Sequence, residues 1–303
     1  MDVASLQKKI RKLLAEKNAV LLAHYYQRGE IQDIADILGD SLALSLGAAK
    51  TNADIIVFAG VHFMAESASI LCPDKTVLLP RMEAGCALAD MINTDQLNEV
   101  KAKNPDVPVV TYINSTAAIK ALSDVCCTSS NAVNVVNSLT DSKRVMMIPD
   151  RNLASYVTHF TDKEILPWRG YCPVHHFLTL DSVRQAKNKY PRALFAAHPE
   201  CTSDVLAMAD FVGSTGGILR YARECDAKEI IIGTEMGVMH QLKKQNPEKT
   251  FIPASDSLIC ETMKCITLED ILHTLVEMKY VIKVPDEIRI PARKALDRML
   301  AIS

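Results

Sequence analysis

Three widely spaced cysteines are the residues of this sequence whose spacing points most clearly to chemistry. Each follows a lysine, a short apolar run and a proline, and each lies in a polar loop; they are Cys86, Cys172 and Cys260. They are 86 and then 88 residues apart (172−86, 260−172). One cysteine per repeating unit predicts that the three thiols meet at the centre of the molecule. Three thiolates suit a 4Fe-4S cluster with one open iron that acts as a Lewis acid, and a zinc site with three thiolates fits the same spacing.

Pairs of polar side chains end the first predicted strand of each unit. The pairs are His24 with Tyr26, Tyr112 with Asn114, and His198 with Glu200. Residues two apart on a strand point to the same face, and ligands of parallel α/β units bind beyond the carboxyl ends of the strands. We therefore expect all six side chains to face one shared cavity. The alternative for each residue alone is a buried polar group with a structural role.

Hydroxyl side chains fall at the starts of three predicted helices: Ser41, Ser129, Ser214 and Thr215. Unpaired N–H groups and the helix dipole favour anions there, so these residues are candidates for binding a carboxylate or phosphate. Ordinary N-capping is the alternative, and one residue can do both. His175 follows Cys172 by three residues and is a candidate for substrate contact; the alternatives are a neighbour of the metal or a surface histidine.

The elements that must position these residues repeat with the same period. Apolar runs at 20–26, 109–114 and 194–200 share offsets of 88 and 86, and Val57 aligns with Val145 and Ile231. In the first unit, helices are expected over 31–38 and 42–50, with Ser41 as the cap of the second. Alternating apolar strands and helices predict parallel sheets covered on both faces.

Several columns with one offset indicate an internal repeat. The fold class is therefore α/β: three similar three-layer α/β/α units with parallel sheets, arranged about a pseudo-threefold axis. The expected units are residues 1–90, 91–177 and 178–266. Residues 267–303 fall outside the repeat; they predict a helix to residue 279, a short strand-like run and a helix over 291–300, which pack back on the first unit.

Composition excludes several classes of function. The chain has 303 residues with a net charge of −2, which gives no argument for nucleic acid or an anionic membrane. No run of about 18 apolar residues occurs, and the first 18 residues predict an amphipathic helix, not a signal peptide. Nine cysteines without a secretion signal favour a reducing cytoplasm. Five are interpreted as inert buried thiols: Cys72, Cys126, Cys127, Cys201 and Cys225.

Eight segments together resemble the signature segments of the quinolinate synthase family. They are residues 22–27, 39–41, 112–115, 127–131, 172–175, 198–201, 213–215 and 233–237. The resemblance runs from about residue 20 to the helix after Cys260. It implies an enzyme of NAD biosynthesis that condenses iminoaspartate with dihydroxyacetone phosphate, losing phosphate and two waters to give quinolinate. The enzyme that makes iminoaspartate is a candidate protein partner.

The resemblance also implies roles for residues. Cys86, Cys172 and Cys260 would hold one 4Fe-4S cluster, whose fourth iron takes the substrate directly. Glu200 would be a general base, and His198 and Tyr26 would assist proton transfer. The groups that would hold carboxylate or phosphate are His24, Ser41, Ser129 and Thr215. Tyr112 and Asn114 would orient the intermediate.

Three other functions fit part of the pattern. An iron–sulfur hydro-lyase shares the open iron, but it gives no reason for a threefold repeat of this length. An iron–sulfur sensor or electron carrier does not need Glu200 beside the cavity. A small-molecule binding protein predicts a protein without metal.

Overall fold

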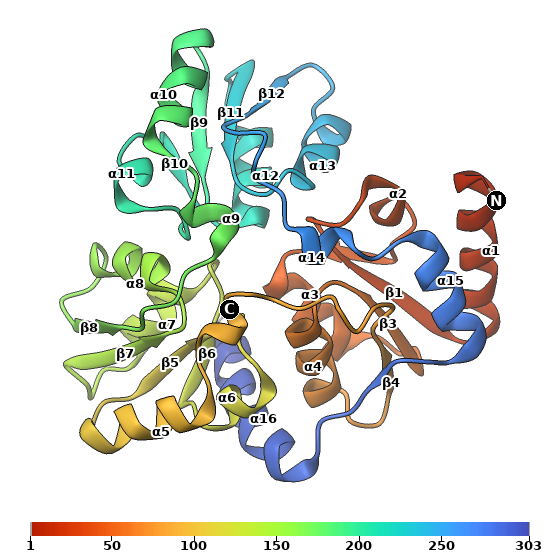
Figure 1. Ribbon diagram of the computed structural model, residues 1–303, viewed down its shortest axis with the longest axis horizontal. Coiled ribbons are helices and arrows are strands. Elements are labelled where there is room, and N and C mark those ends of the chain that lie inside the picture. Colours follow the sequence, from red (N-terminus) through yellow and green to blue (C-terminus); the bar gives the residue numbers. More distant parts are fainter. Residues whose placement is uncertain (1, 303) are drawn as a thin grey trace.

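Three parallel sheets with one shared strand order form the framework of the chain. The computed structural model describes residues 2–302. The outer ends of the predicted first unit and of the predicted tail, residues 1 and 303, therefore lie outside the described residues. The sheets have the orders β2-β1-β3-β4, β6-β5-β7-β8 and β10-β9-β11-β12. Helices flank each sheet, and the three units lie around a common centre in Figure 1. The expected α/β class with three α/β/α units is confirmed.

The strands are short, as expected for buried parallel sheets. In the first unit they are β1 (Ala19–His24), β2 (Ile37–Gly39), β3 (Ile55–Ala59) and β4 (Thr76–Leu78). In the second they are β5 (Val109–Tyr112), β6 (Val125–Cys127), β7 (Arg144–Ile148) and β8 (Glu164–Pro167). In the third they are β9 (Leu194–Ala197), β10 (Phe211–Val212), β11 (Glu229–Gly233) and β12 (Thr250–Pro253).

The helices follow the strands along the chain. The first unit has α1 (Val3–Glu16), α2 (Gly29–Gln32), α3 (Ser41–Lys50) and α4 (His62–Leu71). The second has a 3-10 helix (Ala89–Met91), α5 (Thr94–Lys103), α6 (Ala117–Ala121), α7 (Ala132–Ser138), α8 (Arg151–Thr158) and α9 (Pro173–His176). The third has α10 (Leu180–Lys189), α11 (Ser203–Leu206), α12 (Thr215–Glu224), α13 (Val238–Gln245) and α14 (Glu261–Lys264).

The tail adds α15 (Leu268–Glu277), β13 (Val281–Ile282) and α16 (Asp286–Ala301). Helix α15 packs on α1, and β13 pairs antiparallel with β4. Helix α16 packs on α6 and β6 of the second unit and on α4 of the first. The tail therefore covers the sheet of the first unit and joins it to the second.

The repeat extends to individual hydrogen bonds. Before the second strand of each unit, an aspartate accepts a hydrogen bond from the first strand: Asp36 from Leu21 N–H, Asp124 from Val109 N–H, and Asp210 from Phe195 N–H. The repeated lysines before the fourth strands donate to carbonyl groups at or near the end of an earlier helix in their own unit. These lysines are Lys75, Lys163 and Lys249. Both sets keep the offsets of 88 and 86.

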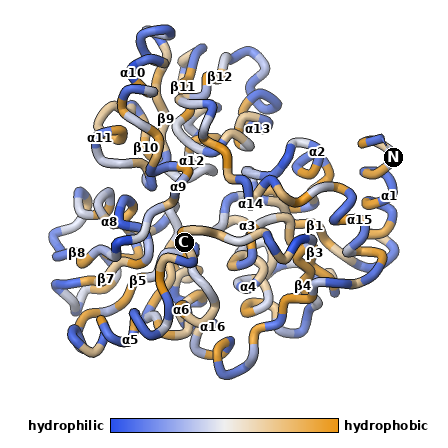
Figure 2. Tube along the Cα trace, in the orientation of Figure 1, coloured by the Kyte–Doolittle hydropathy of each residue, from blue (hydrophilic) through white to orange (hydrophobic). Residues whose placement is uncertain are grey.

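Apolar side chains on the strands build the core, while hydrophilic residues gather in the outer helices and loops (Figure 2). One continuous hydrophobic cluster contains strands of the first and second units and α16, as Leu21, Val110 and Leu296 illustrate. The third unit has its own clusters, around Phe195 and around Ile230. The first and second units therefore share a core, which the third unit joins through Met263 in α14 and Ile266 just after it.

Three local predictions are wrong. Residues 31–38 are not one helix, because Ile37–Gly39 pairs with β1 as an outer strand, and the spacing of Ile31, Ile34 and Leu38 only imitates a helix. Helix α16 begins at Asp286, where two acidic residues suit a helix N-terminus, and Pro291 lies within it. The expected alignment of Val57 with Val145 is also wrong. Leu21 pairs with Val57, 36 residues later (57−21), whereas the equivalent Val109 pairs with Met146, 37 residues later (146−109), so Met146 corresponds to Val57.

Candidate active site

A cavity of about 260 Å³ lies where loops from all three units face one another. Every site residue expected from the sequence lines it except Ser214. The lining residues among them are His24, Tyr26, Ser41, Cys86, Tyr112, Asn114, Ser129, Cys172, His175, His198, Glu200, Thr215 and Cys260. The short helices α9 and α14 lie near the centre of Figure 1, on the loops that carry two of the cysteines.

The three cysteines come from equivalent loops after the fourth strands. Cys172 directly precedes α9, Cys260 directly precedes α14, and Cys86 lies before the 3-10 helix. Burial raises the pKa of Cys86 to about 12 and also raises those of Cys172 and Cys260. The thiols therefore keep their protons at neutral pH unless a metal displaces them.

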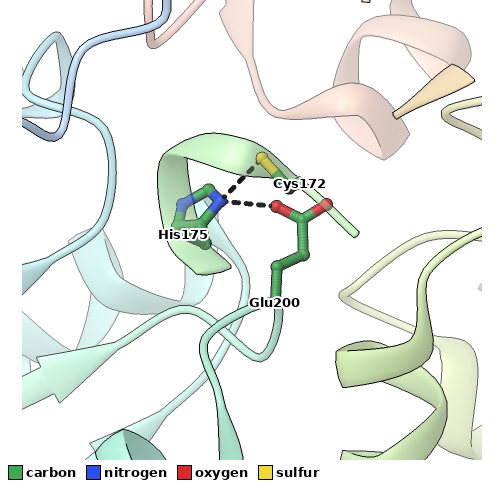
Figure 3. Close-up of side chains that lie close together, drawn as sticks. All are labelled: Cys172, His175 and Glu200. Atoms are coloured by element: carbon green, nitrogen blue, oxygen red, sulfur yellow. Dashed lines mark hydrogen bonds and ion pairs between the residues drawn. The ribbon is translucent and has the colours of Figure 1, made fainter. Parts of the chain in front are cut away.

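Cys172, together with His175 and Glu200, also forms a group whose side chains lie close enough together to hold a metal ion (Figure 3). His175 Nδ1 lies 2.7 Å from Glu200 Oε2 and 3.3 Å from Cys172 Sγ. Two ligands about 2.1 Å from a tetrahedral zinc ion would be roughly 3.4 Å apart, so 2.7 Å indicates a hydrogen bond. We therefore interpret His175 as the partner of Glu200 and not as a metal ligand.

Glu200 is a buried carboxylate held between two imidazoles. Its Oε2 lies 2.7 Å from His175 Nδ1 and 3.3 Å from His198 Nδ1. Burial alone would raise the pKa of Glu200, but the two histidines outweigh it and lower the pKa below its usual range. Within the described residues its Oε1 has no hydrogen-bond partner. An ionised carboxylate with one unpartnered oxygen in a cavity is suited to accept a proton from a ligand.

A chain of hydrogen bonds runs from Glu200 to Tyr26. His175 Nε2 lies 2.9 Å from Thr234 Oγ1, which lies 2.6 Å from the Tyr26 hydroxyl. Thr215 Oγ1 donates to the same hydroxyl at 2.7 Å. Burial raises the pKa of Tyr26 well above its usual value, so the phenol stays protonated. The chain therefore links a proton acceptor to a proton donor, and Thr234 is a member that sequence reasoning did not single out.

The two strand-end histidines are neutral. Burial lowers the pKa of His24 to about 4, and it also lowers that of His198. The N–H of Tyr26 donates to His24 Nδ1 at 3.1 Å, as that of Glu200 does to His198 Nδ1 at 3.3 Å. Nε2 of His198 lies 3.2 Å from Ser129 Oγ. The His24 imidazole can therefore offer its Nε2–H as a hydrogen-bond donor.

Tyr112 and Asn114 complete the wall provided by the second unit. Burial, and then the charge of Glu200, raise the pKa of Tyr112 well above its usual value. The Oδ1 atom of Asn114 is buried and has no partner among residues 2–302. Buried polar atoms are nearly always paired, so this atom and Glu200 Oε1 indicate where a polar ligand binds.

The helix starts differ from expectation. Asp40, not Ser41, caps α3, and Ser129 lies in the turn before α7, whose cap is Asn131. Ser214 caps α12, with Thr215 as the first helical residue. The prediction that Ser41 caps a helix is therefore wrong.

Asp40 joins all three units beside these hydroxyl groups. Its Oδ2 accepts hydrogen bonds from Ser130 Oγ of the second unit and from Ser214 Oγ and Gly216 N–H of the third. A Cβ at Gly216 would lie 2.8 Å from Asp40 Oδ2, so a larger residue there would push the carboxylate away from this position. Sequence reasoning missed Asp40, although it lies in one of the signature segments.

The donor set and the cavity fit a metal cluster. Each unit contributes one thiol, and the buried atoms Glu200 Oε1 and Asn114 Oδ1 leave polar capacity for a ligand. Cysteines outside the cavity are separate from this set; Cys72 Sγ, for example, donates to Ala48 O.

A family model described as quinolinate synthetase A protein matches residues 8–301. The chain belongs to this family. A quinolinate synthase of Geotalea uraniireducens is 60% identical over 293 residues, covering 97% of this chain and 96% of the relative. One of Geobacter sp. (strain M21) is 57% identical over 302 residues, covering 100% and 99%. Quinolinate synthase 1 of Methanosarcina acetivorans is 53% identical over 302 residues, covering 100% and 99%.

Membership confirms the resemblance found in the sequence, and the chain is an enzyme of the quinolinate synthase type. Among residues 2–302, no helix has the length and apolar content needed to cross a membrane.

Proposed function

We propose that this enzyme condenses iminoaspartate with dihydroxyacetone phosphate to form quinolinate, phosphate and two waters, as a step of cytoplasmic NAD biosynthesis. One observation carries the proposal: cysteines from three repeated units line the same cavity as Glu200 and its two histidines. Relatives more than half identical over nearly their whole length are quinolinate synthases, which supports the same reaction.

Cys86, Cys172 and Cys260 would hold a 4Fe-4S cluster. When bound, such a cluster supplies an iron with an open position that polarises substrate oxygen atoms as a Lewis acid. The protein supplies the three sulfur ligands. Burial raises the pKa of the thiols, so they would lose their protons only when the metal binds.

Glu200 is the proposed general base. The ring-forming condensation requires protons to leave carbon and nitrogen, and Glu200 Oε1 is the buried, unpartnered atom that can accept them. The hydrogen bond to His175 Nδ1 keeps the carboxylate ionised and oriented. At the other end of the chain, the protonated Tyr26 hydroxyl can donate a proton to a departing hydroxyl group.

The remaining wall would hold anionic and polar groups of the substrates. Ser41, Ser129 and Thr215 offer hydroxyl donors, and neutral His24 offers an N–H, all facing the cavity. Tyr112 would offer its phenolic O–H, and Asn114 its amide group, as hydrogen-bond partners that orient the intermediate. A cavity enclosed by three units also limits access of water to the labile imine.

The proposal is tested by turnover with purified protein. Anaerobically prepared enzyme is mixed with dihydroxyacetone phosphate and freshly generated iminoaspartate, and quinolinate is measured by chromatography together with released phosphate. Equal amounts of the two products support the proposal. Phosphate release without quinolinate, or neither product from protein that contains the cluster, would overturn it.

A further inference from the structure

The three cysteine loops are fixed by one repeated backbone hydrogen bond. In each unit, a residue shortly after the third strand donates its N–H to the carbonyl two residues before the cysteine. The pairs are His62 with Ala84 O (2.7 Å), Arg151 with Gly170 O (2.8 Å) and Met236 with Leu258 O (2.8 Å). This bond gives the three loops a common attachment to their sheets.

Two units add a carboxylate that binds the cysteine itself. Cys172 N–H donates to Asp150 Oδ2 at 3.0 Å, and Cys260 N–H donates to Glu235 Oε1 at 3.2 Å. Both carboxylates are buried, with 2% of Asp150 and 0% of Glu235 exposed. Loss of either hydrogen bond costs free energy, because a buried N–H or carboxylate oxygen without its partner cannot hydrogen-bond to water instead.

Asp150 and Glu235 occupy the same place in the repeat. Strand pairing makes Met146 and Ile231 equivalent, and each carboxylate follows four residues later (150−146, 235−231). The first unit has Val61 at this position, four residues after Val57. Among residues 2–302, the first cysteine loop therefore has the backbone bond of the repeat without a carboxylate at this position, whereas the other two loops have both.

The second oxygen of each carboxylate binds the start of the next helix. Asp150 Oδ1 accepts the N–H groups of Asn152 and Leu153 in α8. Glu235 Oε2 accepts the N–H of Gly237, the residue before α13, and Glu235 also lies 3.1 Å from Lys264 Nζ. Each carboxylate thus connects a rigid helix start to a cysteine and uses both oxygens to do so.

We propose that Asp150 and Glu235 are positioning residues that hold Cys172 and Cys260 in the orientation required to bind the cluster. The inference rests on the cluster of the proposed function. Neither residue needs to touch the cluster, because fixing the backbone N–H of a cysteine fixes the origin of its side chain. Partners of metal ligands typically change metal affinity by about 10- to 100-fold when they are lost.

Asp150→Asn and Glu235→Gln test the inference. An amide keeps the size of the side chain but has one acceptor oxygen where the carboxylate uses two. Asp124→Asn is the matched control, since Asp124 Oδ2 accepts the N–H of Val109 at the start of β5, at the edge of the sheet opposite the cysteine loops. All proteins are prepared anaerobically, analysed for iron and sulfide, and mixed with an iron chelator while cluster absorbance is followed. Thermal unfolding of the metal-free proteins is measured in parallel.

Iron loss about 10- to 100-fold faster in both cysteine-loop variants than in the parent and Asp124→Asn is the expected result. Equal rates in all four proteins would overturn the positioning role while leaving the cluster in place. Equal acceleration in all three variants, in step with lower thermal stability, would show general loosening and would also overturn it. A parent protein that binds no iron would refute the cluster, and the inference with it.

Discussion

Glu200 has two oxygens in different surroundings. Oε2 lies 2.7 Å from His175 Nδ1, whereas Oε1 is buried without a partner in residues 2–302. The first oxygen keeps the side chain in place, and the second remains for the substrate. The histidines lower the pKa of Glu200, so the carboxylate is ionised throughout the physiological range.

Glu200→Gln is predicted to lower kcat by about 10²- to 10⁴-fold, the usual contribution of a general base. The amide cannot accept the proton, although it preserves the size of the side chain. Quinolinate formation and iron content are measured together, with exposed Glu99→Gln as the control. Unchanged kcat in a cluster-containing variant would contradict the role of Glu200.

His24 predicts a pH dependence of stability. Burial lowers its pKa from 6.5 to about 4 in the folded protein, so the unfolded chain binds the proton more tightly. The stabilisation is complete above pH 6.5 and is lost as the pH falls toward 4. At pH 5 this amounts to about 2 kcal/mol relative to neutral pH.

Unfolding by denaturant at pH 7 and pH 5 measures the effect. The parent should lose about 2 kcal/mol more than His24→Gln between these values, because glutamine does not titrate. Equal losses in parent and variant would show that His24 is protonated freely in the folded protein.

At the scale of elements, the repeated lysines explain a pattern visible in the sequence. Lys249 Nζ donates to Ala222 O and Cys225 O at the end of α12, and Lys163 Nζ donates to Leu139 O and Ser142 O just after α7. A cation near a helix C-terminus satisfies carbonyl groups that lack helical partners and interacts favourably with the helix dipole.

Lys249→Met is therefore predicted to lower the free energy of unfolding by about 1–2 kcal/mol. Methionine keeps the apolar part of the side chain and removes only the ammonium group. Denaturant unfolding measures the change, and Lys243→Met on the exposed surface of α13 is the control. Equal stability of the two variants would contradict the structural role of the repeated lysine.

The strand ends were predictable because apolar runs and polar termini recur at fixed offsets. His24, Tyr112 and His198 therefore converge on one cavity, as the pattern indicated. Asp40 and Thr234 were missed because their roles depend on contacts across units: Asp40 meets Ser130 and Ser214, and Thr234 meets Tyr26. Periodicity within one unit carries no information about such contacts.

Short outer strands were the weakest part of the sequence prediction. Ile37–Gly39 has only three residues, and its apolar positions fit helical spacing equally well. Pairing with β1 decides the outcome, and that pairing is a tertiary contact. The equivalence of Asp150 and Glu235 was hidden for a similar reason, since one extra residue in the second unit shifts the register.

At the scale of the whole molecule, the third unit is joined to the others differently. The first and second units share a hydrophobic core that contains little of the third unit, and the third unit also makes polar contacts with the first. Asp40 contributes two of these contacts, with Ser214 Oγ and Gly216 N–H, and Lys244 pairs with Asp33 at 2.7 Å. Polar contacts can exchange with water, so access to the cavity is expected by movement of the third unit.

Asp40→Ala tests this arrangement. Loss of the carboxylate removes acceptors from Ser214 and Gly216, so amides at the start of α12 should exchange hydrogen at least about 10-fold faster. Hydrogen exchange with mass spectrometry measures the rates, and Ser130→Ala, which removes one donor of the second unit, should give a smaller change. Unchanged exchange in α12 would contradict the role of Asp40 in joining the third unit to the first.

The central claim is that three repeated cysteines form one metal centre. Anaerobic purification followed by iron and sulfide analysis tests it most directly, with Cys225→Ala as the control. We predict four irons and four sulfides per chain in the parent and the control, and loss of the cluster when Cys86, Cys172 or Cys260 is replaced by alanine. Zinc in place of iron, or a parent protein without metal, would contradict the account.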